Sequence, residues 1–438
     1  MSNPLIYARA FHFAATLLLA GVIFFTVFVS EPAFRAAGAD SRVVAAVRRA
    51  IRRMAWSGLG LAAISGATWL VLTAAAMSDV PPAQIMSDGV LGIVLTQTTF
   101  GRAWLIRSVL ACCLTVTLAP FLAARTVRHV GLDAAVTVMA AAFAGGLAWA
   151  GHAAGGLGFE AIIHPAADVL HLVAAAAWLG ALVPLAVLLA AAGAEPTALD
   201  VARAATLRFS IVGMFAVATL LASGIVNSWY LVGSIAALLG TLYGKLLLLK
   251  LALFVGMVSI AAYNWSQLTP ALVASGSIAA AQTARRRLCR NAAIEASAGA
   301  LIIAIVSVLG TLAPANHANH HSTSGPVPAD AAFQHIHSES GMADVMIEPG
   351  RIGSARATIR LWNDDLETLP SRSVTLTLTA PAAGSKPVTR PAVQQPDAAW
   401  IVDGIQLPES GNWTVEVDAV LGTGKRLELS APIVIDAK

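Results

Sequence analysis

Apolar residues dominate the first 312 positions and form stretches long enough to cross a lipid bilayer as helices. A bilayer core requires about 20 consecutive apolar residues in a helix. Lipid also forces backbone polar groups to pair within their own segment, which favours helices over single strands. Eight membrane-spanning helices are therefore predicted, over residues 5–29, 55–76, 103–122, 131–151, 166–191, 209–232, 245–266 and 292–312.

The pattern changes after residue 312. Residues 313–332 are polar and lack periodicity, which predicts a His-containing linker. Beyond it, apolar and polar residues alternate in short stretches separated by Gly and Pro, as in strands with one buried face. Residues 333–438 are therefore predicted to form an all-β sandwich domain. Its predicted strands are 355–362, 373–379, 399–407, 412–420 and 426–435.

The composition agrees with a membrane protein. Of the 438 residues, 57% are hydrophobic and only 12% are Asp, Glu, Lys or Arg, whereas soluble proteins contain about 25% charged residues. So few charges cannot cover a water-soluble surface, which excludes a cytosolic enzyme. Three cysteines cannot supply a disulfide framework. We expect a polytopic all-α membrane bundle without enzymatic activity.

Basic residues predict the orientation of the bundle. The loops after the first, third, fifth and seventh predicted spans hold 14 of them, against 3 on the opposite side. Loops rich in Lys and Arg stay in the cytoplasm, so both termini and the β-domain are predicted to be periplasmic. The first span lacks a charged segment before it and is expected to remain as a membrane anchor.

The eight spans resemble one four-helix unit used twice. In each half a histidine precedes a glycine by nine residues in the first span, and a Ser-Gly pair follows in the second, 54 and 53 residues after that histidine. A unit with an even number of helices keeps its topology, so the halves would be related by an axis along the membrane normal. The matching residues are His12, Gly21, Gly66 and Phe100, and His171, Gly180, Gly224 and Tyr243.

Histidines gather on the predicted outer side, where nine of the ten lie. Imidazole is the commonest neutral metal ligand and suits copper, zinc and iron. The candidate site combines His152, His164, Asp168 and His171 with His12 of the first half. Spacings of four and three residues place His164, Asp168 and His171 on one helix face.

Structural roles for the same residues stay open. His164, before a proline at a predicted helix start, could cap that helix, and Asp168 could pair with Arg9. His12 could bond a backbone carbonyl of a neighbouring helix. Arg107 and Lys250 lie about six residues inside their spans, where long basic side chains can reach the membrane surface. They are predicted to be topology anchors.

A second group of candidate ligands lies at the start of the β-domain. His335 and His337 are two residues apart, which places both on one face of a strand. Met342 and Met346 follow closely. Thioether sulfur favours Cu(I) over harder ions. These four residues are predicted to bind metal.

The helical region resembles the CopD/PcoD family of bacterial copper resistance membrane proteins. The resemblance rests on Gly151-His152, on the segment from Asp168 to Gly180, on Arg208-Phe-Ser, on Tyr243-Gly-Lys-Leu-Leu-Leu-Leu-Lys250, and on Glu295 ahead of Thr311-Leu-Ala-Pro314. The tail, from Phe333-Gln-His-Ile-His337 to Gly411-Asn-Trp413, resembles YtkA/FixH-like β-domains. The resemblance implies copper movement across the inner membrane, usually inward, often beside a periplasmic CopC-type carrier. No CopC-type module is expected at the start of this chain, so copper would come from elsewhere, for example from a separate CopC-type carrier, or from the tail.

The leading hypothesis is a copper transport and homeostasis protein with copper, as Cu(I) or Cu(II), bound at the outer ends of the helices. Two alternatives remain. His12 and His171 could be the axial ligands of a haem b in a membrane redox protein. The protein could also be a copper chaperone for oxidase assembly that never moves the ion across the membrane.

Overall fold

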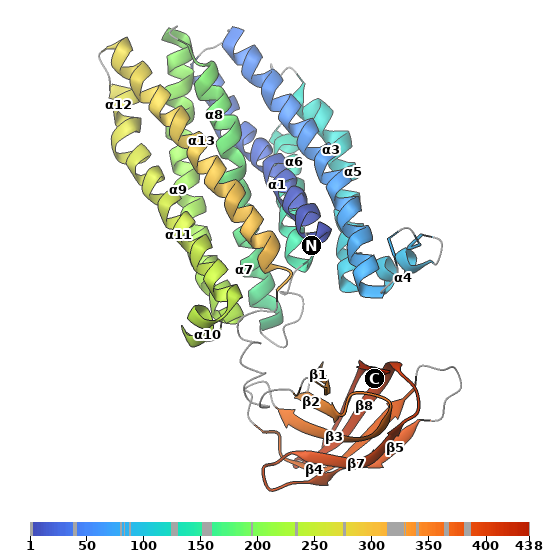
Figure 1. Cartoon of the computed structure of the whole chain (residues 1–438). Coiled ribbons are helices and arrows are strands. Elements are labelled where there is room, and N and C mark those ends of the chain that lie inside the picture. The colour runs from blue at the N-terminus through green and yellow to red at the C-terminus, as the bar shows by residue number, and fades with distance from the viewer. Residues whose placement is uncertain are drawn as a thin grey trace. The chain divides into compact units, whose positions relative to one another are not determined.

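The structure of the whole chain is a computed structural model. It describes residues 3–37, 42–78, 81–82, 84–86, 89–123, 130–150, 160–193, 196–232, 235–274, 277–312, 328, 330–338, 341–362, 368–380 and 387–437. The chain divides into two compact units, Met1–Asn316 and His317–Lys438. The first is helical and the second consists of β-strands (Figure 1).

Eight helices of the first unit are long and apolar enough to cross a membrane, which confirms the predicted number. Several consist of consecutive segments. In chain order the spans are α1 (Pro4–Phe24) with η1 (Phe25–Ser30) and α2 (Glu31–Ala36), α3 (Arg42–Ser78), α5 (Thr99–Leu122), α6 (Val130–Gly145) with η2 (Gly146–Ala150), α7 (Glu160–Ala175) with η4 (Ala176–Gly180) and α8 (Ala181–Ala191), α9 (Pro196–Val232), α11 (Leu242–Tyr263) with η5 (Asn264–Leu268) and α12 (Thr269–Ala274), and α13 (Ile278–Leu309). Two shorter helices, α4 (Val90–Gln97) and α10 (Ile235–Gly240), lie between spans.

Three helices begin well before the apolar stretches that predicted them. The helix α3 begins at Arg42, α9 at Pro196 and α13 at Ile278, where the predicted spans begin at 55, 209 and 292. The added turns are rich in Ala and Arg, which both favour helix, while the charged Arg residues interrupt the apolar pattern. The apolar pattern therefore predicted the membrane-spanning part of each helix but underestimated the length of the whole helix.

The predicted start of the fifth span is wrong. The helix α7 begins at Glu160, so Pro165 lies inside it. A helical proline gives up one backbone hydrogen bond, and the surrounding helix tolerates that loss here. The capping role that we considered for His164 is therefore excluded, because this residue lies in the second turn and not at the end of the helix.

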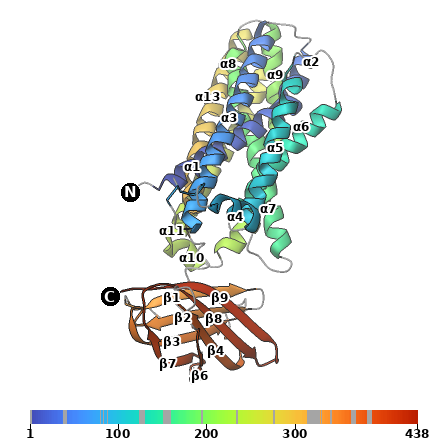
Figure 2. The ribbon, with the colours of Figure 1, turned by 90° about the vertical axis from the view of Figure 1, so that its right-hand side faces the viewer.

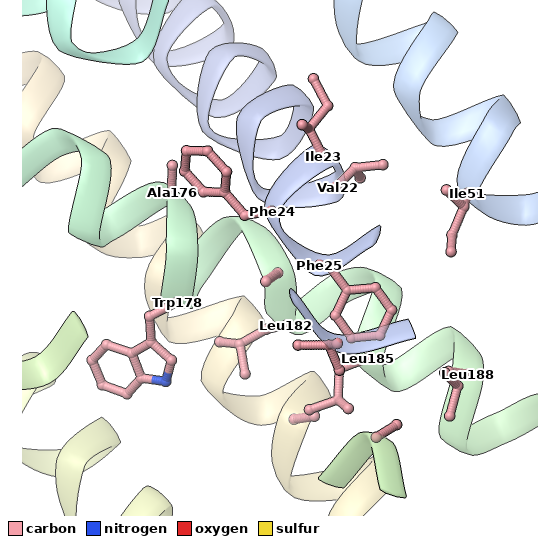
Figure 3. Packing of buried hydrophobic residues seen from close by; sticks show 14 of the residues in the cluster. Val22, Ile23, Phe24, Phe25, Ile51, Ala176, Trp178, Leu182, Leu185 and Leu188 are labelled. Atoms are coloured by element: carbon pink, nitrogen blue, oxygen red, sulfur yellow. The ribbon is translucent and has the colours of Figure 1, made fainter. Parts of the chain in front are cut away.

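The first and fifth spans meet at the centre of the helical unit. Gly21 on α1 and Gly180 on η4 face each other, and a Cβ added to either would overlap backbone atoms of the other helix. This close approach brings apolar side chains of both spans into one core, including Phe25, Leu182 and Leu185 (Figure 3). Since Gly21 and Gly180 hold matching places in the two predicted halves, the halves meet through equivalent residues.

We expect Gly180→Ala to destabilise the helical unit, because the new methyl group would overlap the Leu17 carbonyl on α1. Overpacking of this kind costs about 1–3 kcal/mol or more. Thermal unfolding of the purified full-length protein in detergent measures the loss. Gly60→Ala is the matched control, because a Cβ at Gly60 meets nothing. Equal unfolding temperatures for the two variants would contradict the central contact.

The second unit is a β-sandwich of two antiparallel sheets, as predicted (Figure 2). One sheet has the order β1-β2-β3-β7-β6 and the other β5-β4-β8-β9. Apolar residues of both sheets, Trp413 among them, form a single buried core. The strands are β1 (Ala332–Ser338), β2 (Gly341–Glu348), β3 (Gly353–Trp362), β4 (Ser371–Thr379), β5 (Val388–Pro391), β6 (Val393–Gln394), β7 (Trp400–Leu407), β8 (Gly411–Leu421) and β9 (Arg426–Ile435).

Five of these strands match the predicted ones within a few residues. The strands β1, β2, β5 and β6 are absent from the predicted set. In β2 both faces are largely buried, so the alternation that marks a half-exposed strand is lost. The strands β5 and β6 are short and mostly exposed, which leaves no apolar pattern to detect.

Candidate functional site

Four of the predicted ligands lie near one end of the helical unit, which we call the histidine end. His12 lies on the first half of α1, and His164, Asp168 and His171 lie on α7. The N-terminus and the short helices α4 and α10 lie at the same end (Figure 1). His152 lies outside the described residues, so its place relative to this group stays a prediction.

Every ring nitrogen of His12 has a partner. Nδ1 lies 3.0 Å from the backbone oxygen of Ala62 and 3.3 Å from Ser65 Oγ on α3. Because a carbonyl only accepts, Nδ1 carries the hydrogen. Nε2 then accepts a hydrogen bond of 2.7 Å from the Arg107 guanidinium on α5. The carbonyl bond considered from the sequence is therefore present, and a cationic group covers the remaining lone pair.

Arg107 is buried and is not a surface anchor. Only 2% of the residue is exposed, and besides His12 it donates to the Phe143 carbonyl on α6 and to Thr16 Oγ1. The interpretation that Arg107 extends to the membrane surface is thus wrong. Three acceptors from neighbouring helices compensate for its transfer out of water, and these contacts tie α1, α5 and α6 together.

His171 has the equivalent serine but a different Nε2 environment. Its Nδ1 lies 3.0 Å from Ser223 Oγ on α9. Ser223 already donates its hydroxyl hydrogen to the Thr219 carbonyl, so it accepts from His171 Nδ1–H. The lone pair of His171 is therefore on Nε2, and no hydrogen bond to Nε2 forms among the described residues. An imidazole in this state can bind a metal ion.

The two halves differ around these matched histidines. Arg9 and Asp168 each lie three residues before the histidine of their half. In the first half the Arg9 guanidinium stacks over the Trp69 ring at 5.2 Å. In the second half Asp168 accepts a 2.7 Å hydrogen bond from Asn227, and Asn227 matches Trp69 because both follow the Ser-Gly pair by three residues.

The charges around Asp168 make the second half more polar. Asp168 lies close enough to His164 and Lys250 for Coulombic interaction. The positive charge of Lys250 also disfavours a cation at His171, and the carboxylate of Asp168 offsets that charge. Arg9, the partner considered for Asp168, instead donates to the Gly310 carbonyl at 2.7 Å. The pairing of Asp168 with Arg9 is therefore wrong. A carboxylate beside two imidazoles on one helix face is the arrangement that can receive a cation.

Among the described residues, no three His, Cys, Asp or Glu side chains meet in a way that would hold a metal ion. The structure also does not bring His12 into one group with His171, since each pairs with helices of its own half.

The β1–β2 hairpin carries the second group of predicted ligands. His335 pairs with Asp344 across the ladder, and His335 Nδ1 lies 2.6 Å from Asp344 Oδ1. Trp362 on β3 donates to the other carboxylate oxygen at 3.0 Å. Asp344 is buried. A carboxylate bound to one imidazole nitrogen fixes the orientation of a histidine ring, as it does for many metal-ligating histidines.

The methionines lie on the same face of the hairpin as His335. Ala343, Val345 and Ile347 point into the sandwich core, so Met342 and Met346, which alternate with them, point to the opposite face. Met342 is nevertheless buried. In the ladder Met342 pairs with His337, whose side chain lies outside the described residues. The register thus places the four predicted ligands on one face.

Several residues of these sites escaped the sequence analysis. Asp344 could have been suspected, since a polar residue between apolar neighbours in β2 breaks the strand pattern. Ser65 and Ser223 lie beside glycines that the repeat had already marked. Asn227 has no local signal, because its role depends on contact with α7. Its Oδ1 is buried without a hydrogen-bond partner in the described part of the chain.

Comparison with known protein families gives two matches along the helical unit. Residues 1–162 match the family described as copper resistance protein D-like, N-terminal domain, and residues 203–309 match copper resistance protein D. Together the two matches cover most of the eight spans.

Individual relatives agree with these matches. Copper resistance protein D of Pseudomonas syringae pv. tomato is 32% identical over 329 residues, which cover 72% of this chain and 98% of that protein. The copper transport protein CutJ of Bacillus subtilis is 23% identical over 94% of this chain and 71% of its own length. The inner membrane protein YebZ of Escherichia coli is 33% identical over 57% of this chain and 82% of its own length.

Proposed function

The chain belongs to the copper resistance protein D family, and we propose that it moves copper across the bacterial inner membrane from the periplasm toward the cytoplasm. Copper is then the cargo and not a resident cofactor. The relatives' names describe copper resistance, copper transport and an inner membrane protein, and none of the three is named as an enzyme.

The observation that carries the proposal is the state of His171. Its Nδ1 is held by Ser223 and its Nε2 has no hydrogen-bond donor among the described residues. Asp168 lies one turn away on the same helix and offsets the positive charge of an arriving cation. His164 lies one turn further toward the start of α7. We propose that copper binds here first, with His152 as a further ligand.

The first half supports a different role for His12. Its Nε2 accepts from Arg107, and the positive guanidinium disfavours a second cation at the same nitrogen. Copper could bind His12 only after Arg107 has moved away. In the second half the positive charge of Lys250 also disfavours a cation at His171, but Asp168 offsets it and no described donor covers His171 Nε2. We therefore propose that the second half receives copper, and that His12 joins the path only when the contact with Arg107 opens.

The β-domain is proposed to capture copper on the periplasmic side. His335, His337, Met342 and Met346 lie on one face of a hairpin, and imidazole with thioether is a ligand set that favours copper. The domain would span residues 333–438 and be joined to the helical domain, residues 1–312, by the linker 313–332. A separate CopC-type carrier is the proposed periplasmic partner.

The function is tested by measuring cytoplasmic copper in cells with and without the gene, at equal external copper. Transport predicts higher cytoplasmic copper when the protein is present. Unchanged cytoplasmic copper, together with copper bound to the purified protein, would instead indicate a chaperone that does not move the ion. A haem absorption band of the purified protein would favour the redox alternative.

The hairpin site gives a separate prediction. We expect Asp344→Asn to weaken copper binding by the β-domain about 10- to 100-fold, because the neutral amide no longer orients and polarises His335. Competition titration of the full-length protein with a copper chelator measures the affinity. Asp403→Asn is the control, since Asp403 is an exposed carboxylate paired with Arg356 on the same domain. Equal affinity in both variants would remove Asp344 from the site.

A further inference from the structure

A polar cluster lies inside the helical unit, away from the histidine end. It consists of Glu295 and Asn291 on α13 and Asn264 at the start of η5. Asn264 Nδ2 donates to Glu295 Oε1 at 2.9 Å, and Asn291 Nδ2 donates to Asn264 Oδ1 at 2.7 Å. Glu295 is 2% exposed and Asn291 is 7% exposed. The three side chains thus form a directed chain of hydrogen bonds that ends on a buried carboxyl group.

Glu295 has no basic partner among the described residues. The contrast is Glu31, another buried carboxylate, which forms a bidentate pair with Arg48 at 2.9 Å for each bond. An ionised carboxylate without a counter-charge is costly in apolar surroundings. Two carboxamides supply hydrogen bonds but no charge. Burial at this position therefore favours the neutral acid over the free anion.

The charged groups nearest along α13 are directed elsewhere. Arg290, the nearest, is exposed, as are Arg286 and Arg287. Arg285 donates to the Leu189 carbonyl, and the Cys289 thiol to the Ala186 carbonyl, both on α8. The segments η4, α8, η5 and α12, which pack against α13, contain no titratable residue. The titratable residues of the other helices packed against α13 are Tyr7, Arg9 and His12 on α1, Asp200, Arg203, Arg208 and Tyr230 on α9, and Tyr243, Lys245, Lys250 and Tyr263 on α11.

None of those groups forms a described ion pair with Glu295. Arg9 and His12 are engaged at the histidine end, and Asp200 pairs with Arg203. Lys250 interacts electrostatically with Asp168. Tyr263 precedes Asn264 in the chain and is exposed. Glu295 is thus the carboxyl group whose charge the described surroundings do not neutralise.

A change in helix geometry at Asn264 is a second, independent observation at this polar cluster. The α-helix α11 changes at Asn264 to the π-helical segment η5. Short π-helical segments widen a helix by one residue per turn and occur often at functional sites. Here the change begins at the residue that donates to Glu295, so the distortion sets the position of the side chain that orients the acid.

The donor set argues for a proton and against copper. Carboxyl and carboxamide groups offer hard oxygen ligands, whereas Cu(I) prefers thiolate, thioether and imidazole. Carboxyl groups inside membrane domains commonly take part in proton transfer. Glu295 Oε1 accepts from Asn264, which leaves Oε2 to carry a hydrogen.

We propose that Glu295 is a proton-binding site within the membrane domain, oriented by Asn264 and Asn291, and that proton exchange at this carboxyl group accompanies copper movement. The second part rests on the proposed function. The proton adds to or leaves one carboxyl oxygen, and no other bond changes. The proposed copper path includes no second ion whose movement could drive transport, and a proton bound at Glu295 is such an ion.

The test combines infrared spectroscopy and transport with the full-length protein. Wild type is expected to show the carbonyl stretch of a protonated carboxylic acid that shifts in D2O and survives at neutral pH. Glu295→Gln should lose this band, while Glu31→Gln should retain it. Asn264→Leu should keep the band but shift its frequency, since the hydrogen bond to Oε1 is gone. Absence of the band in wild type at neutral pH would overturn the proposal.

Copper uptake into proteoliposomes tests the coupling separately. Initial rates in wild type should change several-fold between two pH values, and this ratio should fall to about one in Glu295→Gln. An unchanged ratio in Glu295→Gln would refute coupling. If wild type moves no copper at all but shows the band, the proposed transport function fails while the proton site stands. Should Glu295→Gln not fold, Glu295→Asp retains the acid and should move the band.

Discussion

Replacing His171 by Ala is expected to lower copper uptake at least about tenfold while the protein still inserts in the membrane. The His171 ring supplies Nε2, the imidazole lone pair at the histidine end that no described group occupies. Loss of groups that only orient a metal ligand already costs about 10- to 100-fold, so loss of the ligand should cost no less. Initial rates of copper accumulation, normalised to the protein amount in the membrane, measure the effect.

The matched control is Ser223→Ala. Ser223 accepts from His171 Nδ1–H, so its loss frees the ring to change tautomer but leaves the imidazole in place. We expect a smaller decrease in uptake than for His171→Ala. Uptake by His171→Ala at the wild-type rate would remove His171 from the copper path. His12→Ala should affect uptake per folded molecule less, because Arg107 already covers His12 Nε2.

Replacing Arg107 by Ala is expected to destabilise the helical domain by about 2–4 kcal/mol. The change removes a buried charge, which by itself is favourable, since the guanidinium was costly to transfer out of water. It also leaves His12 Nε2 and the Phe143 carbonyl without a donor and opens a cavity. Each buried polar group left unpaired costs about 1–3 kcal/mol, so the loss outweighs the gain.

Thermal unfolding of the full-length protein in detergent measures this difference. Arg102→Ala is the control, because Arg102 lies on the same helix and is exposed. Arg107→Lys should fall between the two, since an ammonium group keeps the charge but not the fork of donors that reaches His12 and Phe143 together. If Arg107→Ala were as stable as Arg102→Ala, the buried hydrogen bonds of Arg107 would not contribute to the stability of the helical domain.

Predicting the elements from the sequence was most successful where a single physical requirement was sufficient. Lipid demands long apolar helices, so eight stretches predicted eight spans. A half-buried sheet demands alternation, so β3, β4, β7, β8 and β9 were found. His335 and His337 were placed on a strand, but β1 and β2 were not among the predicted strands of the sandwich; β2 was missed because it is buried on both faces. The ligands of the β1–β2 hairpin were still suggested, since His and Met side chains carry their own chemical signal.

The residues of the candidate sites were likewise only partly predicted from the sequence. The sequence marked His12 and His171 as a pair and Gly21 and Gly180 as another. It treated the two histidines as equivalent ligands. Their difference arises from Arg107 on α5, which is far away along the chain and reaches Nε2 of His12 only after folding.

The sequence by itself determined a helical protein with eight membrane-spanning stretches and a β-domain, because composition and periodicity are local properties that follow directly from the surrounding solvent or lipid. Only the tertiary structure decided that a donor occupies the Nε2 lone pair of His12 but not that of His171, and that the buried carboxyl group of Glu295 has no described counter-charge. Hydrogen bonds and ion pairs depend on ångström distances between helices that no local pattern encodes, and so Arg107, Asn227 and Asn264 acquire their roles only through packing.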